Sequence, residues 1–290
     1  MISLVIFSKD RAMQLDSLLR SVKDHCTGID RISVVAKASS RLHVDAYYRL
    51  RDHGGYDELV VSDSHGGAPL GHELSLAIED SEHTIVAVDD QLFYRLSDFK
   101  LAAATLDEHA GFVWSWRLGY DPEFTEECPC VEGCYTHWLT TSFVQSPDYS
   151  YLFHSDGALY KTATYTGKLD MYLPDWRTGD YIPNDLEAAV AAKRSRWAVS
   201  AGPHLGPLEP TCITWQLNRV QTKYGSPAGE SLDTALNQLA LAYLDGRRVD
   251  NERLYELLQT DAQRFNPPGA RPTHVYACEE ASKFWVGCVR

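Results

Sequence analysis

The sequence predicts an α/β fold in which a mixed, mostly parallel sheet is flanked by helices. Through the first half of the chain, short apolar runs alternate with amphipathic helical patterns, and this is the order of elements that a parallel sheet requires. Of the 290 residues, 44% are hydrophobic and 23% are charged, which is an ordinary globular composition. The chain is therefore long enough and apolar enough to bury a real core.

The opening residues predict one strand followed by one helix. The apolar run at 2–7 is typical of a buried strand. After it, Leu15, Leu18, Leu19 and Val22 follow the i, i+3, i+4, i+7 spacing of an amphipathic helix. We therefore expect a first βα unit that ends near residue 22.

The remaining segments continue this alternation into a longer fold. We expect strands at 32–36, 59–61, 84–88, 112–116 and 197–200, renewed regular structure at 151–160, and helices at 70–78, 101–109, 162–171, 185–193, 232–244 and 252–260. The Pro, Cys, Glu and Thr content of 118–150 predicts a loop-rich insertion. The expected organisation is a main domain over 1–225 that contains this insertion, followed by a helical C-terminal extension over 226–290.

Charge, apolar run length and cysteine content exclude several classes of protein. Asp and Glu number 40 against 27 Lys and Arg, a net charge of −13, which argues against a nucleic-acid partner whose phosphates must be neutralised. No apolar stretch approaches the roughly 20 residues of a membrane-spanning helix, and the run at 2–7 is too short for a signal peptide. We therefore expect a cytoplasmic protein with no membrane span. Its seven cysteines are expected to be reduced thiols or metal ligands.

Two adjacent carboxylates, Asp89 and Asp90, follow the expected strand at 84–88. In open α/β sheets the carboxyl ends of the strands border the crevice in which ligands bind. Carboxylate oxygens are hard ligands that suit Mg²⁺ or Mn²⁺, and such an ion bridges a diphosphate and neutralises a departing nucleotide. A solvated Asp-Asp turn is the alternative, because Asp is common where a strand gives way to a loop.

Four segments of the sequence, taken in order, resemble one known enzyme family. They are residues 2–11 with the helix that follows, Val88-Asp89-Asp90, residues 153–160 and residues 183–187. The family is that of the GT-A fold glycosyltransferases, the nucleotide-diphospho-sugar transferases. In it, the corresponding segments are the opening βα unit that receives the nucleoside, the metal-binding Asp-x-Asp element, the acceptor-side strand and turn, and the acidic helix start that holds the catalytic base. The resemblance covers roughly residues 1–220.

The resemblance implies transfer of a sugar from a nucleotide-diphosphate donor to a hydroxyl acceptor such as a saccharide, in the assembly of a bacterial surface polysaccharide. It implies Mn²⁺ or Mg²⁺ as cofactor, with Asp90 as direct ligand and Asp89 toward the ribose or the donor sugar. The family's element has acids at both ends of a three-residue window, whereas Gln91 follows the pair here. A catalytically silent nucleotide- or sugar-binding protein is therefore an alternative. A sugar nucleotidyltransferase is another, although residues 8–11 lack the glycine of a phosphate loop.

Residues that follow the first two expected strands are the candidates for the nucleotide site. Lys9, Asp10 and Arg11, together with Ser8, offer a base-reading carboxylate and a cation that faces the diphosphate. Ser39, after the second strand, is a candidate for the ribose pocket. The alternative is an ordinary solvated loop with Asp near a helix N-cap.

The candidates for the catalytic base and for a further metal ligand lie in the second half of the chain. An inverting transferase needs a carboxylate that takes the proton of the acceptor hydroxyl. Asp185 is the first choice because it stands at an expected helix start, where the helix dipole favours its charged form, although the same place suits an N-cap. Asp156, beside a turn, and Glu187 are the other candidates. His204, which we expect in a loop, resembles the C-terminal histidine that completes the metal shell in related enzymes, and a structural loop histidine is the alternative.

The expected insertion holds four soft metal ligands within ten residues. They are Cys128, Cys130, Cys134 and His137. Three thiolates and one imidazole suit tetrahedral Zn²⁺, which would fix the insertion in place. The spacing is not that of two short knuckles separated by a long loop, so reduced thiols are the alternative.

Overall fold

The computed structural model describes residues 1–63, 67–116, 130–132, 135–138, 153–154, 157–193, 204–207, 211–215, 236–260 and 274–275. The main sheet is built from β1 (Ile2–Lys9), β3 (Arg31–Ala38), β4 (Glu58–Asp63), β5 (His83–Val88), β8 (Val113–Ser115), β9 (Cys130–Glu132), β10 (Tyr135–Trp138), β11 (Ala158–Lys161) and β12 (His204–Pro207). These nine strands lie in the order β4-β3-β1-β5-β11-β8-β12-β10-β9.

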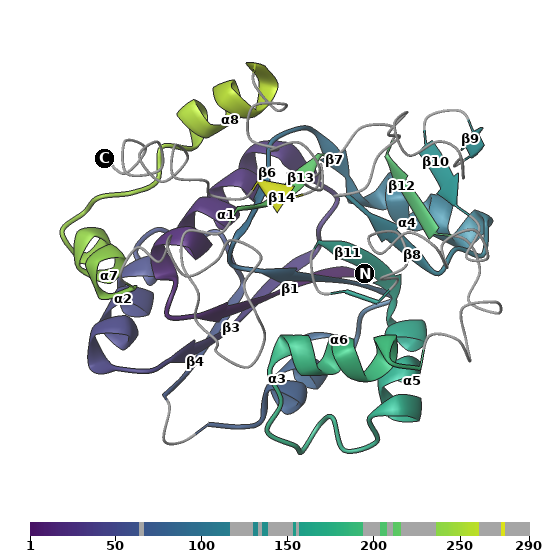
Figure 1. Ribbon diagram of the computed structural model, residues 1–290, viewed down its shortest axis with the longest axis horizontal. Helices are drawn as coiled ribbons and strands as arrows, with labels where there is room; N and C mark the ends of the chain where they lie inside the picture. The colour runs from purple at the N-terminus through teal and green to yellow at the C-terminus, as the bar shows by residue number, and fades with distance from the viewer. Residues whose placement is uncertain are drawn as a thin grey trace.

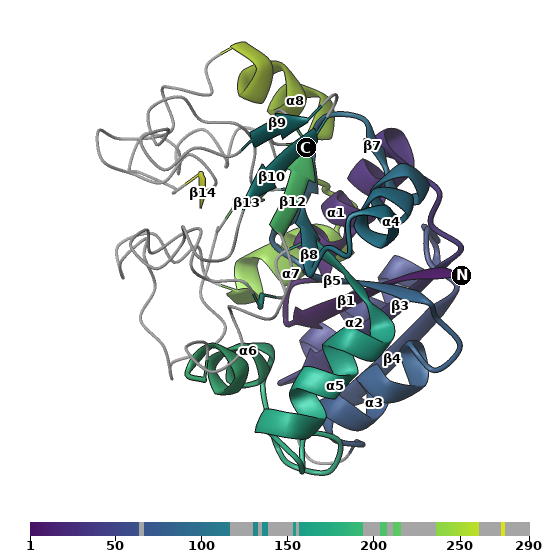
Figure 2. The same ribbon diagram turned by 90° about the vertical axis from the view of Figure 1, so that its right-hand side faces the viewer.

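The strand directions confirm a mixed, mostly parallel sheet. β4, β3, β1 and β5 are parallel to one another, and β12 is parallel to β8. Among the nine described strands, β11 and β10 run opposite to the rest, because β11 is antiparallel to both β5 and β8 and β10 is antiparallel to both β12 and β9. Figure 2 shows β9, β10 and β12 together at one end of the sheet.

Eight helices of the described residues accompany the strands: α1 (Ala12–His25), α2 (Arg41–Arg51), α3 (Leu70–Ala77), α4 (Phe99–Glu108), α5 (Thr162–Tyr172), α6 (Pro183–Ala191), α7 (Leu236–Leu244) and α8 (Asn251–Thr260). Figure 1 shows α3, α5 and α6 grouped on one side of the sheet. None of the described helices is both long enough and apolar enough to cross a membrane.

The central strands are apolar on both faces, so the sheet carries two cores. Along β1, Leu4 and Ile6 pack in one apolar cluster, and Val5 and Phe7 pack in the other, as the alternation of side chains along a strand dictates. The first cluster holds the apolar faces of α1, α2 and α4. The second holds those of α3, α5 and α6. This arrangement explains why the strands read as continuous hydrophobic runs.

Two small sheets complete the fold. One contains β6 (Gln91–Phe93), β13 (Cys212–Trp215) and β14 (His274–Val275), and the other pairs β2 (Cys26–Thr27) with β7 (Ser97–Asp98). β13 is antiparallel to β6, with Gln91 opposite Thr214. Residues 212–215 therefore lie against the segment that directly follows Asp89 and Asp90.

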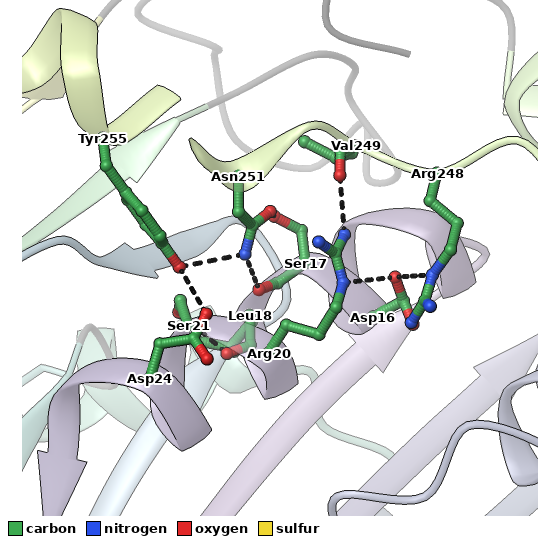
Figure 3. A network of polar contacts seen from close by, with 10 residues as sticks. All are labelled: Asp16, Ser17, Leu18, Arg20, Ser21, Asp24, Arg248, Val249, Asn251 and Tyr255. Atoms are coloured by element: carbon green, nitrogen blue, oxygen red, sulfur yellow. Dashed lines mark hydrogen bonds and ion pairs between the residues drawn. The ribbon is translucent and has the colours of Figure 1, made fainter. Parts of the chain in front are cut away.

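The segment around the start of α8 is fixed to α1 by a polar network (Figure 3). The buried Asp16 carboxylate accepts hydrogen bonds of 3.0 Å from Arg20 Nε and from Arg248 Nε. Ser17 Oγ donates to Asn251 Oδ1 at 2.7 Å, and Asn251 Nδ2 donates back to the Ser17 carbonyl at 2.9 Å. Apolar side chains of α7 and α8 also join the cluster that contains α1. The described C-terminal helices thus share a core with the first βα unit.

Two elements of the structure differ from the expectations drawn from the sequence. A helix at 41–51 was not expected, yet α2 is there. Helix α6 begins at Pro183, two residues before the expected start, because proline is well suited to the first helical position. The expected loop-rich insertion contains β9 and β10, which extend the main sheet by pairing next to β12. The expected strand at 197–200 lies outside the described residues.

Candidate functional site

Asp89 and Asp90 lie directly after β5 and are almost fully buried, at 3% and 5% exposure. The Arg11 guanidinium, 7% exposed, donates through Nη1 to Asp89 Oδ1 at 3.0 Å and to Asp90 Oδ2 at 2.8 Å. Buried carboxylates require an opposite charge or hydrogen bonds, and Arg11 supplies both. The pair is therefore a buried ion-pair site at the carboxyl end of a central strand, and a solvated turn is ruled out.

A chain of hydrogen bonds fixes the second oxygen of Asp89. Ser8 Oγ donates to Asp89 Oδ2 at 2.8 Å, and the Lys9 N–H donates to the same oxygen at 3.0 Å. Ser8 Oγ also lies 2.6 Å from Tyr47 Oη. Because the single hydroxyl proton of Ser8 goes to Asp89, Tyr47 must be the donor to Ser8. The Arg11 N–H in turn donates to Tyr47 Oη at 3.2 Å.

Protonation of this network follows from burial and charge. Burial lowers the pKa of Arg11, but the charges of Asp89 and Asp90 more than reverse this, so its pKa is raised and it stays a cation. Burial and the neighbouring Asp89 charge raise the pKa of Tyr47, so its hydroxyl stays protonated and keeps its role as donor. Burial raises the pKa of Asp89 above its ordinary value, while Arg11 and the hydrogen bonds from Ser8 and the Lys9 N–H act in the opposite direction.

Asp10 connects the loop after β1 to the end of β3. Its backbone is left-handed, with φ of 57°, a conformation that Asp tolerates better than most residues. Its N–H donates to the Lys37 carbonyl at 3.2 Å, and its Oδ1 accepts from the Ser39 N–H at 2.7 Å. The structure therefore brings together the two loops that were expected to form the nucleotide site.

Gln91, which stands where the family's element has an acid, is fully buried in β6. Its Oε1 accepts a hydrogen bond of 3.2 Å from the Val88 N–H. Among the described residues its Nε2 has no hydrogen-bond partner. The amide oxygen is therefore engaged with the end of β5, and Gln91 is not presented as a third metal ligand.

The residues present fit a divalent cation that shares its shell with a ligand. Within the described part of the chain, no three His, Cys, Asp or Glu side chains gather closely enough to hold a metal by themselves. Mg²⁺, however, is commonly held by one or two carboxylates, with phosphate and water oxygens completing its shell. Asp89 and Asp90 supply two carboxylates at such an edge. A cation at this pair would therefore depend on oxygens brought by a diphosphate.

The structure places His204 elsewhere than expected. It begins β12, opposite Val113 of β8 and Trp138 of β10, and is fully buried, whereas we expected a loop residue. Its ring centroid lies 6.3 Å from that of His154, and it belongs to no group of three or more potential metal ligands among the described residues. Pairing with strands on both sides overrides the Gly and Pro residues that suggested a loop. Burial, with the nearby His154, holds the pKa of His204 well below 6.5.

We expect His204 to make stability fall on acidification. The unfolded chain takes up a proton near the ordinary pKa of 6.5, but the folded chain does not. This contribution is fully present above pH 6.5 and is lost as the pH falls, by up to about 1.4 kcal/mol per pH unit. Urea unfolding between pH 7 and pH 5 should show a shallower decline in the free energy of unfolding for His204→Gln than for the parent. An equal decline would contradict a neutral His204, and the exposed His72→Gln serves as control.

The candidate catalytic residues lie at the start of α6. Asp185 Oδ2 accepts the Ile182 N–H at 3.2 Å, so it caps the helix. Glu187 is buried, and burial together with the Glu187 charge raises the pKa of Tyr165. Leu186 belongs to the apolar cluster that also contains Phe7, the residue before Ser8. Helix α6 therefore packs on the sheet face to which Phe7 points, and Ser8, the next residue of β1, points to the opposite face. Asp156 lies outside the described residues.

The structure describes the backbone of two of the four expected zinc ligands. Cys130 of β9 and His137 of β10 are register partners on adjacent antiparallel strands. Cys128 and Cys134 lie outside the described residues. If the four residues form a closed site, protein purified without chelator should contain about one zinc per chain, measured by atomic absorption. Absence of zinc would decide for free thiols.

Comparisons with known proteins give similarities of structure. No family profile matches the chain, and a search of curated proteins gives no match. Among solved structures, S. aureus TarS 1–349 in complex with UDP is 16% identical, with 71% of this chain and 57% of that chain covered and a TM-score of 0.43. The mannosyltransferase PcManGT from Pyrobaculum calidifontis, in complex with GDP-Man and Mn²⁺, is 15% identical over 77% of this chain and 58% of that chain, with a TM-score of 0.41.

A third structure, GalNAc-T7 with UDP, GalNAc and Mn²⁺, is 10% identical, with 98% of this chain and 54% of that chain covered and a TM-score of 0.46. The chain thus spans less than two thirds of the length of each of these three proteins. Each likeness is partial, with a TM-score below 0.5.

Proposed function

We propose that this protein is a glycosyltransferase that moves a sugar from a nucleotide-diphosphate donor to a hydroxyl acceptor. The observation that carries the proposal is the buried pair Asp89 and Asp90 at the carboxyl end of β5, held against the loop that follows β1. In open α/β sheets this edge is where ligands bind. The order of the four sequence segments that resemble the family supports the same conclusion.

In this proposal the donor diphosphate lies beside the carboxylate pair. Asp90 would hold Mn²⁺ or Mg²⁺, and this cation would neutralise the charge that develops on the departing nucleotide. Asp89, fixed by Ser8 and by the Lys9 N–H, faces the ribose or the donor sugar. Asp10 and the Ser39 loop border the nucleoside.

The acceptor side of the proposal rests on helix α6. The acceptor oxygen forms a bond to the anomeric carbon while the bond from that carbon to the diphosphate oxygen breaks. Asp185 takes the proton of the acceptor hydroxyl, a role that its place in the first helical turn supports because the helix dipole favours the carboxylate form. A saccharide acceptor in polysaccharide assembly is supported by the sequence resemblance.

A binding protein without catalytic activity is the second candidate, and the buried Gln91 favours it. Gln91 occupies a position where an acid is usual in the family and uses its amide oxygen on the Val88 N–H. Such a protein would retain affinity for nucleotides without releasing a nucleoside diphosphate.

A thermal-shift screen tests the proposal. UDP, GDP and their common sugar conjugates should be added with and without Mn²⁺, because a ligand that binds the folded state raises the apparent stability by mass action. We expect at least one nucleotide sugar to raise the melting temperature more with Mn²⁺ than without it. No shift with any of them would contradict the proposal, whereas a shift without nucleoside diphosphate release would favour the binding protein.

A further inference from the structure

The guanidinium of Arg11 lies against the carboxylate of Asp90, the residue to which the proposed function assigns the metal ion. A single nitrogen, Nη1, is 2.8 Å from Asp90 Oδ2 and 3.0 Å from Asp89 Oδ1. All three side chains are buried. Arginine is not deprotonated in proteins. The carboxylate pair therefore has a resident cation that cannot be neutralised by losing a proton.

Charge balance decides which ligands the site accepts. With both carboxylates ionised, the side chains of Arg11, Asp89 and Asp90 together carry a net charge of −1. A divalent cation alone would reverse this to +1 and would lie next to the guanidinium, and such like charges repel strongly where water is largely excluded. A diphosphate that arrives with the cation brings at least two negative charges and removes the excess. With a diphosphate that brings two negative charges, the net charge returns to the −1 of the site without metal and diphosphate.

The backbone of Arg11 is held by hydrogen bonds, so that the guanidinium can change partners without movement of the main chain. The Arg11 N–H donates to Tyr47 Oη at 3.2 Å, and the Arg11 carbonyl accepts the Leu15 N–H at 2.9 Å as the first turn of α1 begins. Arginine also matches phosphate oxygens in geometry and charge. A diphosphate bound at this edge would thus offer the guanidinium a third anionic partner besides Asp89 and Asp90.

We propose that Arg11 is a positioning residue that makes divalent-cation binding conditional on the donor diphosphate. In the absence of donor, Arg11 holds Asp90 and excludes the cation. When the donor binds, the guanidinium transfers to a phosphate oxygen and releases Asp90 to the cation. This inference rests on the proposed function and adds to it an order of binding in which Mn²⁺ or Mg²⁺ enters together with the nucleotide.

Mn²⁺ titration by calorimetry tests the inference with four proteins. These are the parent, Arg11→Gln, Arg11→Lys and, as a control that removes an exposed positive charge on α2, Arg41→Gln. Each protein is titrated with Mn²⁺ alone and then with Mn²⁺ in the presence of UDP or GDP. A titration of Mn²⁺ into the nucleotide without protein is subtracted. Far-ultraviolet circular dichroism confirms that each variant is folded.

For the parent we expect weak binding of Mn²⁺ alone and a gain of on the order of tenfold or more when the nucleotide is present. Arg11→Gln should bind Mn²⁺ alone on the order of tenfold more tightly than the parent, because an opposing charge within a few ångströms has been removed. It should also lose most of the gain from nucleotide. Arg11→Lys, which keeps the charge, and the Arg41→Gln control should behave like the parent.

Three results would overturn the inference. The first is tight binding of Mn²⁺ to the parent without nucleotide, which decides the question even if Arg11→Gln does not fold. The second is an Arg11→Gln variant that is folded and binds Mn²⁺ alone no better than the parent. The third is equal tightening in the Arg41→Gln control. If the parent binds neither UDP nor GDP under any condition, the proposed function fails, and the comparison of Mn²⁺ alone still decides the role of Arg11.

Discussion

Asp90→Asn is expected to abolish the Mn²⁺-dependent part of donor binding. An amide oxygen is a much weaker ligand for a hard cation than a carboxylate, and the substitution also removes one of the two negative charges that attract the ion. Loss of groups that merely orient a metal ligand costs 10–100-fold in metal affinity, so loss of the ligand itself should cost on the order of 100-fold or more. The measurement is the affinity for the nucleotide sugar with and without Mn²⁺.

The design of this variant separates binding from folding. Asn keeps the size of Asp90 and leaves Arg11 paired with Asp89 at 3.0 Å. Asp45→Asn, which removes a carboxylate from the exposed ion pair of α2, is the matched control and should bind as the parent does. Equal Mn²⁺-dependent binding by Asp90→Asn and the parent would show that Asp90 is not the ligand.

Asp185→Asn is expected to lower turnover by on the order of 100-fold or more, because the acceptor hydroxyl loses its proton acceptor. The amide oxygen can still accept the Ile182 N–H, so the start of α6 should persist. Since a base acts on the chemical step, the affinity for the donor should change little. Initial rates at saturating donor, together with a separate measurement of donor affinity, check both parts.

The neighbouring carboxylates decide the outcome if this expectation fails. Asp175→Asn, which alters an exposed hydrogen bond to Tyr181, is the control that should leave turnover unchanged. Normal turnover of Asp185→Asn combined with an inactive Asp156→Asn would assign the base to the acceptor-side turn. If both variants keep full activity, the base is Glu187 or Asp180, or the mechanism is a retaining one.

The strands that position the site were predictable from sequence because they consist almost entirely of apolar residues. β1 and β5 are buried on both faces and therefore read as apolar runs that stop at polar residues. Their ends placed Asp89, Asp90 and the loop after β1 at one edge of the sheet. Parallel pairing of the two strands, with Phe7 opposite Val88, confirms that placement.

The contacts inside the site were not predictable in the same way. The bonds from Arg11 to Asp89 and Asp90 join residues 78 and 79 positions apart, and nothing local in either segment specifies them. The sequence offered Lys9 and Arg11 as cations for a diphosphate, and in the structure Arg11 is paired with the two carboxylates. Tyr47 was missed together with α2, because charged and polar residues obscure an apolar stripe that includes Tyr47 and Leu50. That stripe is the pattern that would have revealed the helix.

The most direct measurement of the proposed function is the release of nucleoside diphosphate from a nucleotide sugar by the purified chain. We expect UDP or GDP to be released from at least one UDP- or GDP-linked sugar in the presence of Mn²⁺, faster when a saccharide acceptor is added. The release should disappear in Asp90→Asn. Binding of nucleotide sugars without release, or release that is equal in Asp90→Asn and the parent, would contradict a glycosyltransferase centred on the carboxylate pair.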